Sequence, residues 1–338
     1  MRGFLGVDVG SVSTNLVVLD ERGEVVSLIY RRTQGRPINA VQEGIKELES
    51  DLAHAVEIAG VGTTGSARYL SGVIIGADII KNEITAHAIA ASHVAPQVRT
   101  VLEIGGQDSK IILLRDGIVV DFAMNTVCAA GTGSFLDHQS ARLGIPIEEF
   151  GGHALKAAVP CQIAGRCSVF AESDMIHKQQ IGYRMEDIVY GLCQALVRNY
   201  LNNLAKGKEL AAPIVFQGGV AANAGMKRAF EEALQMEVVI PEHHHVMGAI
   251  GAALLAKAAV RDGATNFNGF SVSAAEYQTR SFHCKGCENN CEIVKIQAEG
   301  KTLACWGGRC GKWELEGTEN AKPLVHPSSD KQAKVASG

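Results

Sequence analysis

The chain repeats a strand-and-turn unit, and this repeat constrains its fold more than any other feature. Residues 6–26 (GVDVGSVSTNLVVLDERGEVV) and 101–120 (VLEIGGQDSKIILLRDGIVV) share one order: an apolar strand with one acidic residue, glycine, small polar residues, and two further strands around a charged turn. Helices are predicted at about 38–52 and from about Asn82. Repetition at this scale indicates two similar α/β domains that face each other across a cleft.

Composition narrows the class of protein. A chain of 338 residues is too long for one small core, so we expect two domains and an appendage. The net charge of −4 gives no reason to expect nucleic acid or a membrane as partner. The longest apolar stretch, 246–256, is too short to cross a bilayer, and the start shows no signal peptide. We therefore expect a cytoplasmic protein, in which nine cysteines favour metal, cluster or redox roles over disulfides.

Each copy of the repeat places a glycine turn directly after its first strand. Backbone N–H groups there can hold phosphate oxygens, and nearby acidic side chains then require a divalent cation such as Mg²⁺. A third glycine turn, in IVFQGGVAANAG (214–225), opens a helix and allows close approach to a flat ligand. The candidate catalytic residues are Asp8, Glu103, Gln107 and Asp108, and the candidate nucleotide-binding residues are Gly10, Ser11, Val12, Ser13, Gly105, Gly106, Gly218, Gly219 and Asn223.

These motifs resemble a known superfamily. GVDVGSVST, EIGGQDSK and QGGVAANAG are similar to the two phosphate motifs and the adenosine motif of the actin, Hsp70 and sugar-kinase ATPases. Within that superfamily, NTVCAAGTGSFLD (125–137) and GRCSVFAESDMIHKQQ (165–180) resemble the ATP-dependent activators of 2-hydroxyacyl-CoA dehydratases and the ATPase subunits of benzoyl-CoA reductases. The resemblance covers about residues 3–257 and implies duplicated ribonuclease H-like domains flanking a nucleotide cleft. Glu103 departs from the second phosphate motif, because the superfamily usually has Asp at this position.

Cys128 and Cys167 each stand before a predicted helix. The helix dipole favours a thiolate, and free N–H groups can hydrogen-bond sulfide. Two such thiols are half of a four-cysteine shell, which a second copy of the chain would complete around one [4Fe–4S] cluster per homodimer. The resemblance implies the same arrangement. Cys193 is predicted to be a buried apolar residue, and Cys161 has no assigned role.

The function expected from these features is an ATP-driven one-electron donor. Reduced ferredoxin or flavodoxin would supply the electron, and an iron–sulfur dehydratase or reductase would receive it. Two alternatives stay open: a small-molecule kinase of the same superfamily, for which no catalytic base is evident, and a non-redox protein that clamps a partner with ATP.

One glutamate and several histidines near these motifs have simpler interpretations than a role in catalysis or metal binding. Glu83 either lines the cleft or is a solvated carboxylate at a helix start. His87 and His93 are expected to be packing or surface residues, and His243–His245 a loop.

The C-terminal part carries a second group of cysteines. The expected boundaries are 1–98 for the first subdomain, with the 245–260 helix as a candidate to complete it, 99–260 for the second, 261–279 for a linker, 280–316 for a cysteine-rich domain and 317–338 for a flexible tail. EIVKIQ and KTLACW predict a β-hairpin too small to bury a core, for which a metal usually substitutes. Cys284, Cys287, Cys305 and Cys310 have a zinc-ribbon-like order, whereas a second Fe–S cluster would also recruit Cys291.

Overall fold

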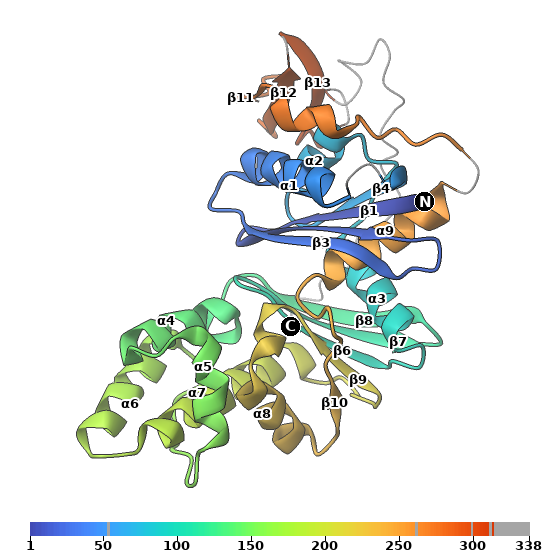
Figure 1. The fold of residues 1–338 in the computed structure, drawn as a ribbon. Coiled ribbons are helices and arrows are strands. Elements are labelled where there is room, and N and C mark those ends of the chain that lie inside the picture. The colour runs from blue at the N-terminus through green and yellow to red at the C-terminus, as the bar shows by residue number, and fades with distance from the viewer. Residues whose placement is uncertain (53–54, 261–262, 299, 311–312, 314–338) are drawn as a thin grey trace. The chain divides into compact units, whose positions relative to one another are not determined.

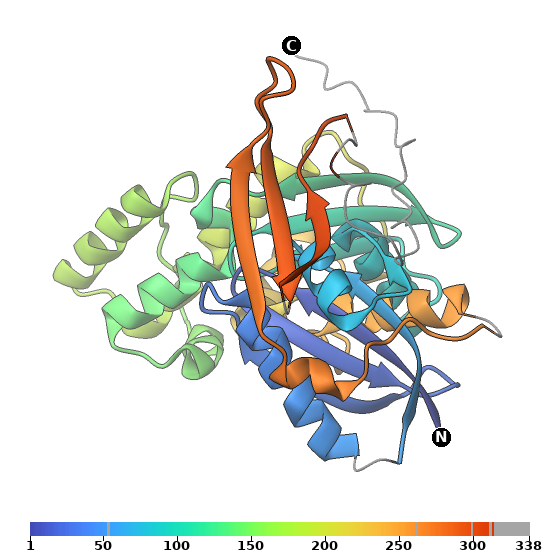
Figure 2. The same cartoon turned by 90° about the horizontal axis from the view of Figure 1, so that it is seen from above.

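A computed structural model describes residues 1–52, 55–260, 263–298, 300–310 and 313 (Figures 1 and 2). The chain divides into a larger unit, Met1–Ser273, and a smaller one, Ala274–Gly338, and each is described by itself.

The first half of the larger unit is a five-stranded sheet in the order β3-β2-β1-β4-β5. β1, β2 and β3 are antiparallel neighbours, and β4 and β5 run parallel to β1. Its elements in chain order are β1 (Arg2–Val9), β2 (Ser13–Leu19), β3 (Val25–Arg32), α1 (Pro37–Leu52), β4 (Glu57–Thr64), α2 (Arg68–Ile75), β5 (Ile79–Ile80) and α3 (Glu83–Val94).

The second half repeats this sheet. Its strand order, β10-β9-β6-β7-β8, is that of the first sheet read from the other edge, with the same directions between equivalent neighbours. The predicted duplication is therefore confirmed. The strands are β6 (Thr100–Ile104), β7 (Ser109–Arg115), β8 (Ile118–Asn125), β9 (Ile214–Gln217) and β10 (Val238–Val239).

A helical segment separates β8 from β9 and covers one face of the second sheet (Figure 1). It comprises the 3₁₀ turn η1 (Ala129–Gly131), α4 (Gly133–Leu143), α5 (Ile147–Leu155), α6 (Ser168–Gln180), α7 (Met185–Tyr200) and the π turn η2 (Leu201–Ala205). After β9 come η3 (Gly219–Ala222), α8 (Ala224–Leu234), α9 (Met247–Ala259) and η4 (Phe270–Ala274).

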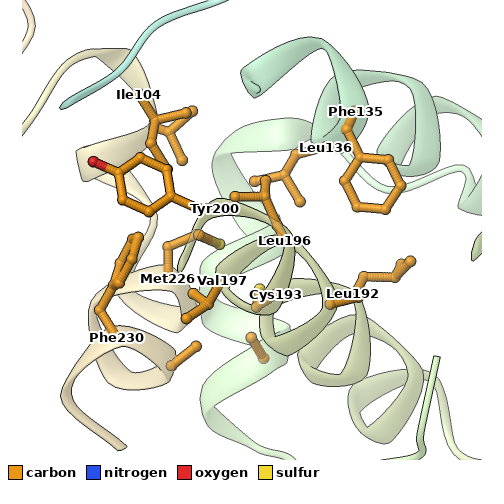
Figure 3. Close-up of a cluster of buried hydrophobic side chains, with 14 of the residues drawn as sticks. Ile104, Phe135, Leu136, Leu192, Cys193, Leu196, Val197, Tyr200, Met226 and Phe230 are labelled. Carbon is orange, nitrogen blue, oxygen red and sulfur yellow. The ribbon is translucent and has the colours of Figure 1, made fainter. Parts of the chain in front are cut away.

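The core of the second half lies between α7, α8 and the sheet. α7 presents apolar residues three and four positions apart, which is the spacing that buries one face of a helix. Figure 3 shows Leu192, Leu196 and Tyr200 along α7, with the Tyr200 ring beside Phe230 from α8. Cys193 is fully buried among them, which confirms its predicted apolar role.

Helices α3 and α9 lie between the two sheets (Figure 1). α9 packs directly on β1 and β4, since a β-carbon at Gly6 or Gly62 would overlap the backbone of Ala249 or Ala252. α3 is rich in alanine, and these small side chains let it pack closely against α9 and against the second sheet. A helix late in the chain thus lies on the first sheet, while the predicted domain boundaries stay predictions.

The smaller unit contains a three-stranded antiparallel sheet in the order β11-β12-β13. Its strands are β11 (Tyr277–His283), β12 (Glu292–Ala298) and β13 (Lys301–Trp306). β12 and β13 pair where the hairpin is predicted, and β11 begins inside the predicted linker. The predicted tail, 317–338, lies outside the described residues. Among the residues that are described, no helix has the length and apolarity needed to span a membrane.

Candidate functional site

A pocket of about 450 Å³ lies in the larger unit and receives residues from both halves. All of the residues predicted for catalysis and nucleotide binding line it, so the structure brings these candidates together. They are Asp8, Gly10, Ser11, Val12, Ser13, Glu103, Gly105, Gly106, Gln107, Asp108, Gly218, Gly219 and Asn223.

The two glycine turns that line the pocket have the same closing hydrogen bond. Gly10 N donates to Ser13 O at 2.8 Å between β1 and β2, and Gly105 N donates to Asp108 O at 3.0 Å between β6 and β7. In each turn the residues between donor and acceptor line the pocket. Backbone N–H groups in such turns can hold anionic oxygens.

Lys110 is a buried cation that the sequence reasoning missed. Its Nζ lies 2.8 Å from a carboxylate oxygen of Glu83, 2.9 Å from Asp108 and 3.1 Å from Glu103. Burial lowers the pKa of Lys110, but Glu103, Glu83 and Asp108 together outweigh burial and hold this pKa well above its ordinary value. A lysine directly before the apolar run of residues 111–114 in β7, in the strand that follows β6 and its Glu103, is the signal that could have found it.

Asp8 is the carboxylate that β1 contributes to the pocket, and it is partly buried. Burial and then the charge of Glu83 raise its pKa from 3.8 to about 7. Asp8 forms no ion pair with any residue that the structure describes, and it packs so tightly against Gly65 and Gly248 that a β-carbon on either would collide with its carboxylate. Oxygen ligands of this kind suit a hard cation such as Mg²⁺.

Glu83 and His87 enter the pocket from α3. Of the two interpretations for Glu83, the pocket-lining one is confirmed, since this side chain pairs with Lys110. His87 is buried as one interpretation expected, but it also lines the pocket, and its Nδ1 lies 2.8 Å from Gln217 Nε2. Burial, and then the charge of Lys110, lowers the pKa of His87 from 6.5 to about 3, so its imidazole is neutral.

The third glycine turn is held by the histidine loop. Gly218 N donates to His244 O at 2.8 Å, and Nδ1 of His244 lies 2.9 Å from Gly218 O. The predicted loop at His243–His245 is confirmed as a turn, and the sequence reasoning did not foresee that His244 and His245 line the pocket.

One wall of the pocket is suited to a nucleoside. Asn223 caps α8 by accepting a hydrogen bond from Met226 N, while its buried Nδ2 has no hydrogen-bond partner in the structure. Leu136, Ile147 and Val220 supply apolar surface to the same pocket. An unused buried donor beside apolar side chains fits a flat heteroaromatic ligand with hydrogen-bonding edges.

Cys167 stands at a helix start, as predicted, whereas Cys128 stands at the start of a 3₁₀ turn five residues before a helix. Cys128 precedes the 3₁₀ turn η1, which leads into α4, and Cys167 is the N-cap residue of α6. Both thiols are partly exposed, and next to them Val127, Val169 and Phe170 are 94%, 66% and 67% exposed. Large apolar side chains thus lie exposed near both thiols.

The start of α4 is bonded to the second glycine turn. Gly133 N donates to Gly105 O at 2.9 Å, and Ser134 N donates to Gly106 O at 2.8 Å. The N–H groups of this helix start are therefore engaged by the pocket backbone. The segment that carries Cys128 is thus joined directly to the turn that lines the pocket.

The C-terminal cysteines lie near one end of the smaller sheet. Cys284 follows β11, Cys291 precedes β12 and Cys305 lies near the end of β13, and strand register places these three positions at the same end. Gly286 N donates to Cys284 Sγ at 3.4 Å. Across the described residues, however, no three His, Cys, Asp or Glu side chains are arranged to hold a metal ion. The metal site on these cysteines stays a prediction.

Two similar halves with paired glycine turns, and a pocket between them lined by carboxylates, give a two-sheet α/β architecture of the kind found in nucleotide-binding ATPases. The chain belongs to the BadF/BadG/BcrA/BcrD ATPase family, which it matches over residues 5–256. The resemblance stated from the motifs is thereby confirmed.

Characterised relatives cover the same region. The chain is 34% identical over 259 residues to the (R)-2-hydroxyglutaryl-CoA dehydratase activating ATPase of Acidaminococcus fermentans, covering 75% of this chain and 96% of the relative. It is 33% identical over 258 residues to the activator of lactoyl-CoA dehydratase of Anaerotignum propionicum, with 75% and 96% covered. A solved activator of 2-hydroxyisocaproyl-CoA dehydratase from Clostridium difficile, with bound ADPNP, superposes with a TM-score of 0.70 at 28% identity, covering 77% of this chain and 96% of that one.

Proposed function

We propose that the protein is an ATP-dependent one-electron donor that activates an iron–sulfur dehydratase or reductase. The observation that carries this proposal is a backbone hydrogen bond between the segment of Cys128 and the second glycine turn, which Gly133 N donates to Gly105 O. Relatives that are named activators of dehydratases, and a relative from Thauera aromatica that is named as part of its benzoyl-CoA reductase, support the same activity.

The pocket would bind ATP with Mg²⁺. The turns at Gly10 and Gly105 would hold phosphate oxygens through backbone N–H groups, and the free Nδ2 of Asn223 would bond to the nucleoside. Asp8 and Asp108 would face Mg²⁺ or its water ligands, and the bound ion would neutralise charge that develops on the phosphates. The chain's own part in hydrolysis is positioning, because the turns and carboxylates are already in place.

The thiols of Cys128 and Cys167 would hold one [4Fe–4S] cluster between two copies of the chain. Two thiols per chain are half of the four that such a cluster needs, and the exposed Val127 and Phe170 would be covered in the homodimer. When bound, the cluster supplies a site for one electron at low potential. Cys128 directly precedes η1 and Cys167 directly precedes α6, so both thiols would be presented from the ends of connecting segments.

ATP would act on electron transfer by changing the relative positions of the two halves. A nucleotide shifts such an equilibrium only by its different affinity for the two states. Reduced ferredoxin or flavodoxin would load the electron, and the dimer would pass it to the client enzyme.

Anaerobic purification followed by iron, acid-labile sulfide and ATPase measurements tests the proposal. We expect about four irons and four sulfides per dimer, a brown colour, and ATP hydrolysis. An iron-free dimer that hydrolyses ATP would contradict electron donation and favour the clamp alternative. Phosphorylation of a small molecule by an iron-free chain would favour the kinase.

A further inference from the structure

Two adjacent residues at the end of α7, Asn199 and Tyr200, contact different parts of the site. Both are buried, with 5% and 1% of their surface exposed. Tyr200 contacts the strand that carries the pocket lysine, and Asn199 contacts both segments that carry the candidate cluster thiols. The end of one helix thus connects the nucleotide pocket with the two cysteines.

Tyr200 forms the connection to the pocket. Its hydroxyl donates to the backbone oxygen of Lys110 at 2.5 Å, across 90 residues of sequence. Lys110 is the cation that pairs with Glu83, Glu103 and Asp108. The ring of Tyr200 packs edge-on against Phe230, with centroids 5.3 Å apart, so the hydroxyl is held in place (Figure 3).

Asn199 reaches the segment of Cys167. Its Nδ2 donates to the backbone oxygen of Gly165 at 2.6 Å, two residues before Cys167. Arg198 donates to Ile163 O at 2.5 Å, and Asp174 accepts from Ala164 N at 2.8 Å, so consecutive residues of this loop are fixed to α6 and α7.

Asn199 also touches the segment of Cys128. A β-carbon at Gly131 would lie 2.7 Å from Asn199 Oδ1 and 2.9 Å from Asn125 Nδ2, so both amides pack on the backbone at Gly131. The Asn125 amide in turn accepts from Cys128 N at 2.9 Å and donates to Cys128 O at 2.8 Å. One buried amide therefore lies between the two cysteine segments.

The backbone that follows Asn199 has an unusual form. α7 ends at Tyr200 and continues as the π turn η2, and Asn203 from this turn donates to Asn199 Oδ1 at 3.0 Å. This bond orients the Asn199 amide so that Nδ2 faces Gly165. The Asn199 amide is thus held from both sides, by Asn203 in η2 and by Gly165 in the segment of Cys167.

We propose that Asn199 is a positioning residue that fixes the Cys128 and Cys167 segments relative to each other, and that Tyr200 makes their arrangement respond to the nucleotide. The proposal rests on the function proposed above. A movement of the second glycine turn would be passed to Cys128 through Gly133. The same movement would be passed to Asn199 through Lys110 and Tyr200.

Thiol alkylation in the iron-free, full-length protein tests the positioning role without a cluster. Rates of modification by iodoacetamide are measured at Cys128 and Cys167 by peptide mass spectrometry. Asn199→Ala should raise the rate at Cys167 about fivefold, since the hydrogen bond that holds the segment of Cys167 to α7 is lost. Asn199→Asp keeps the side-chain shape but cannot donate to Gly165 O, so it should also raise the alkylation rate at Cys167. This second variant replaces the first if Asn199→Ala does not fold. The exposed Asn202→Ala, on the next turn, is the matched control.

The coupling role is tested with Tyr200→Phe, which removes only the hydroxyl. In the original protein, the alkylation rates with bound ADP should differ from those with a bound non-hydrolysable ATP analogue. In Tyr200→Phe, only a minor fraction of this difference between the two nucleotides should remain. Asn199 variants that match Asn202→Ala would overturn the positioning role, and nucleotide-independent rates in the original protein, or a full response in Tyr200→Phe, would overturn the coupling.

In iron-loaded protein, the electron paramagnetic resonance spectrum of the reduced cluster should change in Asn199→Ala and not in Asn202→Ala. If no preparation binds iron, the proposed electron transfer fails, but the alkylation result still decides the role of Asn199.

Discussion

Lys110 lies directly opposite Glu103 in the antiparallel pair of β6 and β7, and its Nζ is 3.1 Å from a carboxylate oxygen of Glu103. Asp108, two residues earlier in the chain, and Glu83 from α3 meet the same ammonium group. One cation thus serves three carboxylates, and Asp8, Asp137 and Glu148 also line the pocket. This excess of acidic groups is an environment that suits a divalent cation, which would favour their ionised forms.

Lys110→Met should destabilise the protein by about 3–5 kcal/mol, because buried carboxylates lose their counter-charge. Urea denaturation of the nucleotide-free chain measures the loss. Lys208→Met is the control, since Lys208 pairs with Asp121, which is exposed, and such pairs contribute at most about 1 kcal/mol. Adding Glu103→Gln to Lys110→Met should recover part of the loss. Equal costs for the two lysine variants would contradict a central role for Lys110.

Asp8→Asn should lower Mg-ATP hydrolysis by about two orders of magnitude or more, because a carboxylate that positions the metal is lost. The cluster absorption should stay intact, since Cys128 and Cys167 are on other segments. Asp20→Asn, in the turn after β2, should hydrolyse ATP normally. Unchanged turnover in Asp8→Asn would place catalysis away from the first glycine turn.

Cys128→Ser and Cys167→Ser should each abolish the iron content and electron transfer of the dimer, and ATP binding should persist. The reason is that two of the four cluster thiols are lost in the homodimer with each substitution. Iron analysis and ATP titration are the measurements, and Cys193→Ser, at a fully buried position, is the control for general effects on the core. A full cluster in either cysteine variant would rule out the bridging arrangement.

His87 should make the protein sensitive to acid. Its pKa is about 3 in the folded chain and about 6.5 when unfolded, so only the unfolded chain takes up a proton between these values, and stability is lost as pH falls. Between pH 7.5 and 5.0, the loss of unfolding free energy should be about 2 kcal/mol smaller in His87→Gln than in the original protein. His93→Gln, at an exposed position on the same helix, should behave like the original. Equal pH dependence in all three proteins would mean that His87 accepts a proton when folded.

We propose a cysteine-bound metal in the C-terminal unit, and metal analysis in a Cys128→Ser/Cys167→Ser background isolates it. One zinc per chain is expected for a structural site, and iron with sulfide for a second cluster. Cys284→Ser should remove either metal, whereas Cys291→Ser should remove only a cluster. A chain that binds no metal and unfolds identically with and without Cys284 would end this proposal.

The sequence predicted the fold and most of the pocket because their signals are local. A glycine after a strand, an acid beside it, and their recurrence about 95 residues later are visible without a structure. The roles of Lys110, His87 and Asn199 were not visible, because each depends on a contact between distant segments: Lys110 with Glu83, His87 with Gln217, and Asn199 with Gly165. The proposed cluster site also exceeds what one chain can show, since it would need two.

The position of α9 on β1 and β4 has a consequence for how the protein is made. A ribosome releases β1 first, but the helix that covers it follows more than 200 residues later. At about 5–20 residues per second, the first sheet waits roughly ten seconds or more for its partner, while β6 to α8 have already emerged. The second half can therefore fold first. Until α9 is synthesised, one apolar face of the first sheet stays uncovered, and this is the stage of synthesis at which a chaperone would protect the chain most.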